Sequence, residues 1–374
     1  MKKAIQVGVS IVLSIVLFGM LNPSAVYAAS ISQMYYGSGA IRSMTVRADG
    51  TVVGGRSSGH EIEVWGSSDK GASWNRIGTV ANNSTIDFGD VMFMAVPNTN
   101  IIYCAFREYN SAHQYAITVC RSDDGGYNWV YDSTVIAGCT QFVGAPWLFI
   151  AQNGDMQCYY DSEPLATQNG MSGSQWIAMQ GRNGRSGSWN KYGVVAASRD
   201  ANITKFVRDG MASVVDLGNN RIMLVTEGIE DSASGGQYAN VVRAIQSFDG
   251  GLSWDYSGRQ IIYQCGIDGG SGRRYNAYCP VATRVGNGPV GVVFCTDEDF
   301  GGTPDNSWAD VTVRRSHIKY IRTLNNFETW GGKASIWTNG SQAYAPGIIE
   351  TAFNELLVTV DHFYGNQSFH RMYP

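Results

Sequence analysis

Short apolar segments recur along the chain in pairs, each pair joined by a turn rich in Asn, Asp and Gly. The six pairs span residues 44–55, 91–106, 147–160, 211–226, 281–296 and 348–360. Two apolar segments joined by such a turn are typical of a β-hairpin. The turns recur every 50 to 70 residues or so, about the length of one four-stranded propeller blade. The pattern therefore predicts an all-β chain folded as a six-bladed β-propeller.

A second repeat has the form Ser-x-Asp-x-Gly-x-(Ser/Asn)-Trp and occurs at residues 67–74, 122–129 and 247–254. Its Asp, Ser and Asn side chains suit the capping of turn N–H groups, its Gly suits a positive φ, and its Trp can fill space between blades. Degenerate copies lie at residues 183–189 and 325–330. The repeat resembles the Asp-box of sialidase-type propellers. It predicts structural turns between the third and fourth strands of a blade.

The last blade has too few strands of its own. After the sixth hairpin only residues 367–373 remain before the end of the sequence. We expect residues 32–36 to supply the missing strand, which would close the ring and remove an open sheet edge.

The first 28 residues differ from the rest. Lys2 and Lys3 precede an apolar stretch at residues 4–21, and small residues follow at 26–29. These features are typical of a secretory signal peptide, and the stretch is short for the alternative, an uncleaved membrane anchor. We predict a signal peptide over residues 1–28, a single catalytic propeller over residues 29–374, a secreted protein, and no membrane contact after cleavage.

The net charge and the cysteine content limit the kinds of ligand and cross-link that we expect. The net charge of −4 becomes −6 when residues 1–28 and their two lysines are removed, which argues against nucleic acid as a partner. The seven cysteines are odd in number and scattered, and only Cys265 and Cys279 form a plausible disulfide. No Cys-x-x-Cys pair occurs, and we read the acidic loop 297–305 as solvated rather than as a Ca²⁺ site. We expect no metal or cofactor, and a monomer.

Propeller topology predicts which residues lie at the ligand-binding mouth. Hairpin turns and Asp-boxes share one face, so the residues that begin the first strand and end the second strand of each blade ring the opposite face. Charged residues concentrate at these positions. They include Arg42, Asp90, Arg107, Glu108, Asp161, Glu163, Arg208, Asp209, Glu227, residues 297–299, Asp361 and His362, with Trp147 and Tyr344.

Glu163 and Glu227 follow corresponding apolar segments of adjacent predicted blades, so their carboxylates can converge. Glycoside hydrolysis needs such a pair, one group to protonate the leaving oxygen and one to attack or to activate water. Tyr344 is the third candidate, either as a partner that orients a carboxylate or as a nucleophile.

Over residues 35–374 the sequence resembles the sialidase clan of six-bladed glycoside hydrolases, and within it the family-93 exo-arabinanases. The resemblance rests on Arg42 with residues 49–50, on residues 145–149 leading to 159–163, on residues 208–211 leading to Glu227, and on residues 343–344. It implies Glu163 as acid/base, Glu227 as nucleophile and Tyr344 as the partner of Glu227. The implied reaction releases arabinobiose with retention from the non-reducing end of α-1,5-arabinan.

Three alternatives remain: a sialidase, another glycosidase or lyase of this clan, and a non-catalytic sugar-binding propeller. Sialidases begin their arginine triad with Arg-Ile-Pro, whereas this chain has Ile41-Arg42-Ser43. A triad would need Arg42, Arg208 and one of Arg273, Arg274, Arg314 or Arg315.

A neutral furanose needs aromatic platforms and acids instead. The candidate platforms are Trp147, Tyr160, Tyr275, Tyr278 and His362, and the other candidate substrate contacts are Arg42, Asp90, Arg208, Asp209 and Asp361.

Overall fold

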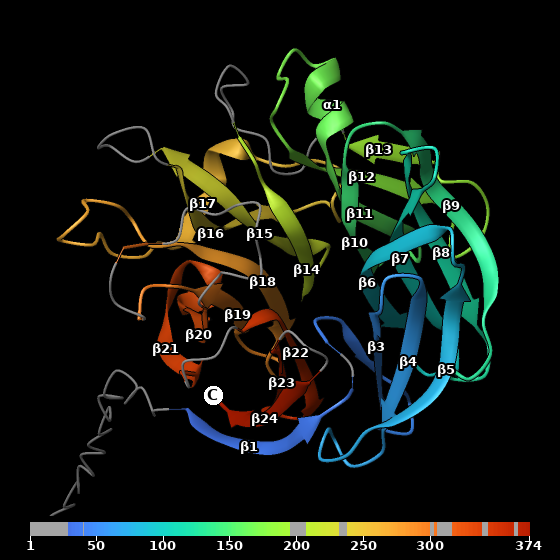
Figure 1. Cartoon of the computed structure of the whole chain (residues 1–374), viewed down its shortest axis with the longest axis horizontal. Coiled ribbons are helices and arrows are strands. Elements are labelled where there is room, and N and C mark those ends of the chain that lie inside the picture. The colour runs from blue at the N-terminus through green and yellow to red at the C-terminus, as the bar shows by residue number, and fades with distance from the viewer. Residues whose placement is uncertain are drawn as a thin grey trace, which may run out of the picture.

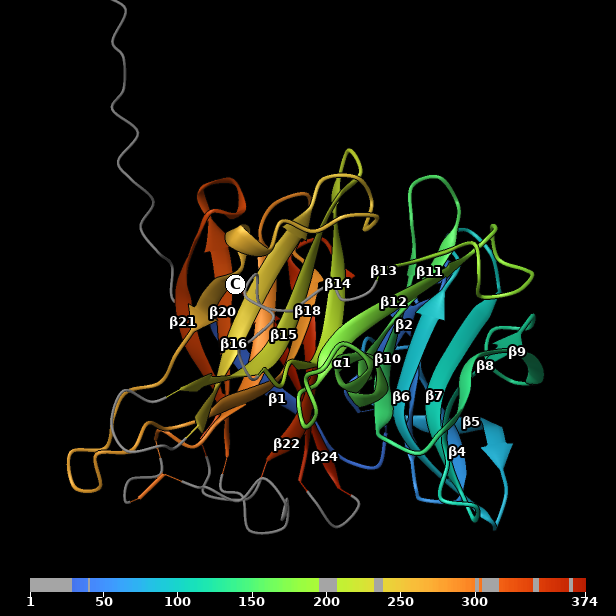
Figure 2. The ribbon, with the colours of Figure 1, turned by 90° about the horizontal axis from the view of Figure 1, so that it is seen from above.

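The computed structural model describes residues 29–39, 41–194, 207–231, 238–299, 303–304, 316–338, 343–362 and 366–374. The predicted signal peptide lies outside these residues, as do Arg314 and Arg315. The described strands form six four-stranded antiparallel sheets arranged around a central axis (Figure 1). Seen from the side, the strands run between the two faces of the ring (Figure 2). The predicted six-bladed propeller is confirmed.

The blades follow one another along the chain. Blade 1 contains β2 (Met44–Val46), β3 (Val52–Ser57), β4 (Glu61–Ser67) and β5 (Asn75–Asn82). Blade 2 contains β6 (Ile86–Ala95), β7 (Ile102–Asn110), β8 (Tyr115–Ser122) and β9 (Val130–Cys139). Blade 3 contains β10 (Val143–Ile150), β11 (Met156–Ser162), β12 (Trp176–Arg182) and β13 (Tyr192–Val194), with helix α1 (Glu163–Gln168) after β11.

Blade 4 contains β14 (Gly210–Gly218), β15 (Arg221–Asp231), β16 (Tyr238–Ser247) and β17 (Gln260–Tyr263), with the 3-10 helix η1 (Tyr256–Gly258) before β17. Blade 5 contains β18 (Ala277–Arg284), β19 (Val290–Thr296), β20 (His317–Leu324) and β21 (Thr329–Trp337), with the 3-10 helix η2 (Asn325–Phe327) before β21. Blade 6 contains β22 (Tyr344–Ala352), β23 (Glu355–Asp361), β24 (Gln367–Tyr373) and, at its outer edge, β1 (Ser30–Gly37).

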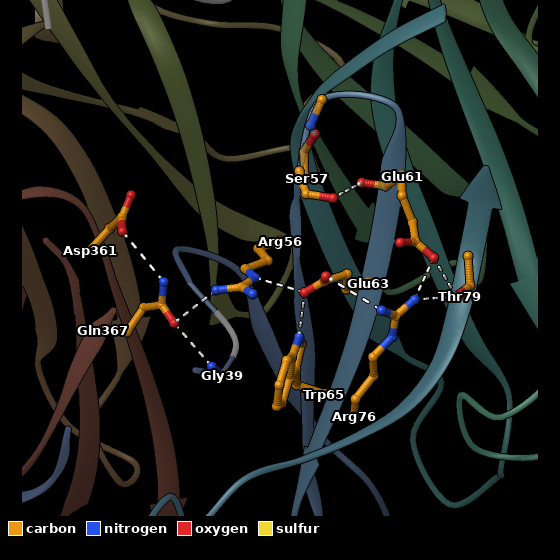
Figure 3. A network of polar contacts seen from close by, with 12 residues as sticks. Gly39, Arg56, Ser57, Glu61, Glu63, Trp65, Arg76, Thr79, Asp361 and Gln367 are labelled. Carbon is orange, nitrogen blue, oxygen red and sulfur yellow. Dashed lines mark hydrogen bonds and ion pairs between the residues drawn. The ribbon is translucent and has the colours of Figure 1, made fainter. Parts of the chain in front are cut away.

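The N-terminal strand closes the ring, as predicted. β1 pairs antiparallel with β24 from Ser30 opposite Tyr373 to Gly37 opposite Gln367. A polar network then joins blade 6 to blade 1 (Figure 3). In it Arg56 donates to Gln367 Oε1 at 3.4 Å and pairs with Glu63 at 2.7 Å. The seam between the two ends of the chain is therefore held by strand pairing and by side chains.

The core is divided among the spaces between blades. One apolar cluster fills each of the six junctions between neighbouring blades. The cluster between blades 1 and 2, for example, contains Val53, Ile62, Phe93 and Phe106, all nearly inaccessible to solvent. Every residue of β11 and of β19 is buried. Burial of this apolar surface is the main stabilising term and fixes each blade against the next.

The three Asp-boxes form the turns between the third and fourth strands, as predicted. In the first, Asp69 Oδ1 accepts from Ser73 N at 2.8 Å, and Ser67 Oγ accepts from Gly71 N at 2.7 Å. Gly71 has φ +92°, a value that suits glycine. The other two boxes repeat these bonds. The boxes thus act as caps of tight turns, far along their strands from the opposite mouth.

The proposed disulfide is wrong. All seven cysteines are free thiols, and Cys265 and Cys279 are both buried. Cys265 Sγ contacts Asn276 O at 3.2 Å and Thr296 Oγ1 at 3.1 Å instead of a second sulfur. Sequence proximity across a loop did not bring the two sulfurs together. Among the described helices, none has both the length and the apolar character needed to cross a membrane.

Candidate active site

Near the start of the innermost strand of every blade, one non-glycine residue has φ in the left-handed region; in blade 1 it lies two residues before β2, and in the other blades within the first five residues of the strand. These residues and their φ values are Arg42 (53°), Asp90 (52°), Ala145 (42°), Met211 (56°), Cys279 (49°) and Ala345 (39°). On blades 2 to 6 a register shift between the first two strands accompanies the residue. Non-glycine residues adopt this conformation at a cost, and it is frequent at functional sites. Because all six blades carry this kink at the same end of the innermost strand, it is a structural feature shared by the whole mouth.

The kinks bind carboxylates across blade boundaries. The N–H of Ala145 donates to Asp90 Oδ2 at 3.2 Å, and the N–H of Met211 donates to Asp161 Oδ1 at 3.1 Å. The N–H of Cys279 donates to Glu227 Oε2 at 2.7 Å. In each pair the acid belongs to the preceding blade. Three consecutive blades therefore present one acid each, fixed by the backbone of the next blade.

These acids surround a cavity of 490 Å³ at the mouth. Its lining consists of Asp87, Asp90, Arg107, Tyr109, Tyr115, Phe142, Asp161, Gln175, Arg208, Met211, Glu227, Asn240 and Tyr344. A smaller cavity of 170 Å³ shares Asp90, Met211 and Tyr344 with it and adds Arg42, Arg56 and Asp361 among others. Of the predicted site residues, Arg42, Asp90, Arg208, Glu227, Tyr344 and Asp361 thus meet at one mouth.

Glu227 lies within β15 opposite Gly210, the residue before the kink of blade 4. Tyr344 occupies the position before the kink of blade 6 and lines both cavities. Its ring lies 6.4 Å from that of Tyr278, centroid to centroid. A carboxyl group and a phenol from blades 4 and 6 therefore open onto the same space.

Glu163 is not the strand equivalent of Glu227. β11 ends at Ser162, whose side chain caps α1, and Glu163 is the first residue of that helix. The Glu163 carboxylate pairs with Arg208 Nη1 at 2.9 Å, and its Oε2 accepts from Phe142 N at 3.3 Å. Both partners line the larger cavity. Glu163 itself is not in the lining; it lies next to the cavity, bonded to two lining residues, with its side chain 24% exposed.

The true equivalent of Glu227 is Asp161, which sequence reasoning placed at the mouth but gave no catalytic role. It lies opposite Gly144, as Glu227 lies opposite Gly210, and the Gly–kink pairs 144–145 and 210–211 were the available signal. Gln175 Nε2 donates to it at 3.3 Å. Burial, and then the neighbouring charge of Asp90, raise the pKa of Asp161 well above its usual value. Its surroundings therefore favour the neutral form of this carboxyl group over the ionised form.

Most arginines at the mouth already hold carboxylates. Arg107 pairs with Asp87 at 3.1 Å and Asp90 at 3.2 Å, and Arg56 pairs with Glu63 as described above. Arg42 differs, because its Nη1 is buried without a hydrogen-bond partner among the described residues. Of the predicted third members of an arginine triad, Arg274 donates to Cys265 O at 2.6 Å, and neither it nor Arg273 lines the two cavities.

The predicted aromatic platforms lie elsewhere. Tyr160, Tyr278 and His362 are buried, while Trp147 and Tyr275 pack against the clusters between blades. Tyr160 adjoins Asp161 in β11, so its side chain points to the other side of the sheet. Among these five, none is in the lining of either cavity.

Three other rings line the larger cavity. Tyr109 and Tyr115 have centroids 4.5 Å apart, and Phe142 packs on Tyr115 at 5.5 Å.

Asp209, also predicted to contact substrate, is buried in ion pairs with Arg243 and Arg259. Within the described ranges, no group of three or more His, Cys, Asp and Glu residues has an arrangement suited to a metal ion.

Solved structures of other proteins share this architecture. The chain superimposes on the family-93 α-L-arabinofuranosidase of Fusarium graminearum, solved with arabinobiose, with a TM-score of 0.63 and 17% identity over 90% of this chain and 97% of that one. For the α-L-arabinanase of Penicillium chrysogenum, also complexed with arabinobiose, the values are 0.61, 16%, 91% and 97%. The chain therefore shares the six-bladed propeller fold of these two proteins.

The NanB sialidase of Streptococcus pneumoniae has the same architecture, with a TM-score of 0.58 and 9% identity over 90% of this chain and 68% of that one. No protein-family model matches the sequence. No curated protein matches it either. The likeness to glycoside hydrolases is therefore one of fold.

Proposed function

We propose that this protein is a secreted, retaining exo-glycoside hydrolase that releases arabinobiose from the non-reducing end of α-1,5-arabinan. The observation that carries the proposal is the convergence of Glu227, Asp161 and Tyr344 on one cavity, with Glu163 next to it, bonded to the lining residues Arg208 and Phe142. Retaining glycosidases need one carboxylate that attacks the anomeric carbon and one carboxyl group that protonates the leaving oxygen. Export depends on residues 1–28 acting as the signal peptide.

Glu227 is the proposed nucleophile. One of its oxygens accepts the Cys279 N–H at 2.7 Å, and this bond fixes the carboxylate in the cavity. Attack of the carboxylate on the anomeric carbon breaks the glycosidic bond and forms a glycosyl-enzyme ester, which water then hydrolyses. Tyr344, which opens onto the same cavity, orients Glu227 in the proposed mechanism.

Glu163 is the proposed acid/base. This group must recover a proton from solvent in every cycle, and Glu163 is a quarter exposed whereas Asp161 is only 3% exposed. Arg208 holds Oε1 of Glu163 at 2.9 Å, and Oε2 accepts only the neutral Phe142 N–H at 3.3 Å, so Oε2 is the oxygen proposed to carry the transferred proton. Asp161, which is buried and has a raised pKa, acts as a positioning group in this proposal, since its neutral form adds no negative charge beside Glu227.

A neutral substrate fits the charges of the mouth better than sialic acid. Arg56, Arg107 and Arg208 each hold a carboxylate of the protein, and of the described arginines at the mouth only Arg42 has a buried nitrogen without a partner. A carboxylate ligand would require several arginines with free donors. Stacked Tyr109, Tyr115 and Phe142 offer an apolar wall for a sugar ring.

The test measures products released from linear α-1,5-arabinan, with a fluorogenic sialoside and 4-nitrophenyl arabinobioside assayed in parallel. We expect arabinobiose as the first product, with its anomeric configuration retained when followed by NMR. Turnover of the sialoside without turnover of arabinan would contradict the proposal.

A further inference from the structure

A second large cavity lies on the opposite face of the ring. It has a volume of 900 Å³ and is formed by the turns between the first two strands of blades 4 and 5, together with Phe248 and η2. These turns are on the Asp-box face, at the far ends of the strands from the mouth. We name it the far-face groove and define it by Arg221, Arg284, Arg322, Phe248 and Phe327. Its volume is within the range of ligand-binding pockets.

Aromatic rings and backbone carbonyls hold two of the three arginines of this groove, Arg221 and Arg284. The Arg221 guanidinium lies 5.2 Å from the ring centroid of Phe248 and 5.3 Å from that of Phe327. Arg284 lies 4.9 Å from the Phe327 centroid and donates to Asp216 O at 3.0 Å and Asn287 O at 3.1 Å. The Nε of Arg284 is buried without a hydrogen-bond partner among the described residues. The positive charges are thus fixed in place but not neutralised.

Other arginines on the same face are neutralised. Arg47 pairs with Asp49 at 2.7 Å, and Arg121 pairs with Asp123 at 2.9 Å. The lining of the far-face groove, by contrast, contains three arginines and no acid.

Three acids adjoin lining residues in the sequence: Asp216, Asp249, which caps its Asp-box turn, and the exposed Glu328 after η2. Asp216 and Glu350 accept hydrogen bonds from turn N–H groups. Asp216 Oδ1 accepts from Gly218 N at 2.8 Å, and Glu350 accepts from Gly286 N at 2.5 Å and Asn354 N at 2.8 Å. In a chain with a net charge of −4, such a concentration of unpaired cations indicates an anionic ligand.

The groove coincides with a departure from the Asp-box repeat. At the position where three other blades carry a box, blade 5 has Asn325, Asn326 and Phe327, with φ values of 42°, 57° and 72°. Three successive non-glycine residues in the left-handed region are unfavourable locally. Their effect is to bring the Phe327 ring to the guanidinium groups of both Arg221 and Arg284. The degenerate box thus builds part of the groove.

We propose that the far-face groove binds an acidic oligosaccharide, in which each sugar carries a carboxylate. Guanidinium groups bind carboxylates through two parallel hydrogen bonds. Phe248, 67% exposed, offers a ring for the apolar face of a sugar. Nucleic acid, with its denser charge, is disfavoured by the net negative charge of the protein. The groove would hold an acidic polysaccharide while the mouth on the other face remains open, so its occupancy does not depend on hydrolysis.

Isothermal titration of the full propeller with hexagalacturonate tests this proposal. We expect a single site for hexagalacturonate whose affinity falls with added salt. Neutral arabinohexaose, which the mouth is proposed to bind and cleave, should give heat that does not depend on the arginines of this groove. Arg221→Gln and Arg322→Gln should each weaken binding at least about tenfold, because each removes a cation from the groove. Arg121→Gln, on the same face but ion-paired and outside the groove, is the matched control and should bind as the wild type does.

Three results would overturn the proposal. The first is no binding of hexagalacturonate, and the second is binding by Arg221→Gln and Arg322→Gln that is as tight as that of the wild type. The third is tighter binding of hexathymidylate that depends on the same arginines, which would assign the groove to nucleic acid. Arg322→Lys, which keeps the charge, and a thermal unfolding curve for each variant distinguish lost contacts from lost folding. Glu227→Gln should still bind hexagalacturonate, so a failure of the proposed hydrolase activity would leave this test intact.

Discussion

The Glu227 carboxylate accepts a hydrogen bond from the backbone N–H of Cys279 at 2.7 Å, across the boundary between blades 4 and 5. The bond depends on the left-handed φ of Cys279, so the conformation of one blade fixes an acid of its neighbour. Glu227→Gln keeps the shape and an acceptor oxygen but removes the attacking charge. We expect an unchanged melting temperature and a loss of kcat of about a thousandfold or more on arabino-oligosaccharides. A variant with near wild-type kcat would remove Glu227 from the mechanism.

The proton donor can be identified by chemical rescue. In Glu163→Ala, azide can enter the space left beside Arg208 and attack the glycosyl-enzyme ester. We expect azide to restore turnover of an activated aryl arabinoside by Glu163→Ala and to give the glycosyl azide with retained configuration. Glu227→Ala is the control, since it can form no ester. Rescue of Asp161→Ala in place of Glu163→Ala would transfer the acid/base role to Asp161.

The raised pKa of Asp161 predicts how the stability of the fold changes with pH. Its pKa is raised in the folded state, so the folded protein binds this proton more tightly than the unfolded chain does. The wild type should therefore lose stability relative to Asp161→Asn as the pH rises from about 4 towards neutrality, by up to about 1.4 kcal/mol per pH unit. Urea unfolding at pH 4, 5.5, 7 and 8 measures the difference. A difference that stays constant over this range would show that Asp161 is ionised in the fold.

Tyr344 separates the two leading substrate classes. If it orients Glu227 for a neutral sugar, Tyr344→Phe should lower kcat on arabinan by about 10- to 1,000-fold, and the wild type should not act on sialosides. In a sialidase the phenol would be the nucleophile, and Arg42→Ala would raise KM for the sialoside steeply. Parallel kinetics on both substrates distinguish the two outcomes.

The Asp-boxes should matter for stability and not for chemistry. Asp124 accepts two backbone N–H groups, from Tyr127 at 3.1 Å and Asn128 at 2.9 Å, and the bond from Asn128 contributes most to lowering the pKa of Asp124 to about 2. Its stabilising effect is therefore present above about pH 4 and lost as the pH falls towards 2. Asp124→Ala should cost about 1 kcal/mol at pH 7, as for other lost caps, with kcat unchanged. Asp123→Ala, in the same turn but ion-paired to Arg121, is the control.

The sequence predicts the ring better than it predicts the mouth. Blade number, the Asp-box turns and the closing strand follow from spacing, because each blade repeats the same local pattern. The side chains at the mouth depend on register, and the kink at Ala145 shifts the register between Gly144 and Trp147. That shift places Asp161 opposite Gly144 and leaves Glu163 to α1. The type of the kinked residue differs from blade to blade, for example Arg42 in blade 1 and Ala345 in blade 6. Apart from the Gly that precedes the kink in some blades, this register change therefore has no simple sequence pattern.

The predicted platform residues lie outside the lining of the two cavities for a related reason. Alternation along a strand sends neighbours to opposite sides of the sheet, so Tyr160 packs between blades while Asp161 lines the cavity. Tyr109 and Tyr115, near the end of β7 and the start of β8, line the cavity instead. Tyr109 lies beyond residue 106, where the predicted hairpin of blade 2 ends, and Tyr115 lies in the third strand, so neither was among the predicted residues of the mouth.

The pairing of β1 with β24 constrains the order in which this protein can be assembled. β1 emerges from the ribosome first and its partner more than 300 residues later. Until then blade 6 is incomplete and β1 has a free edge, which can pair with other chains. Five blades can form during synthesis, but ring closure must await the last strand. A chaperone that shields this strand during synthesis would therefore raise the yield of folded protein.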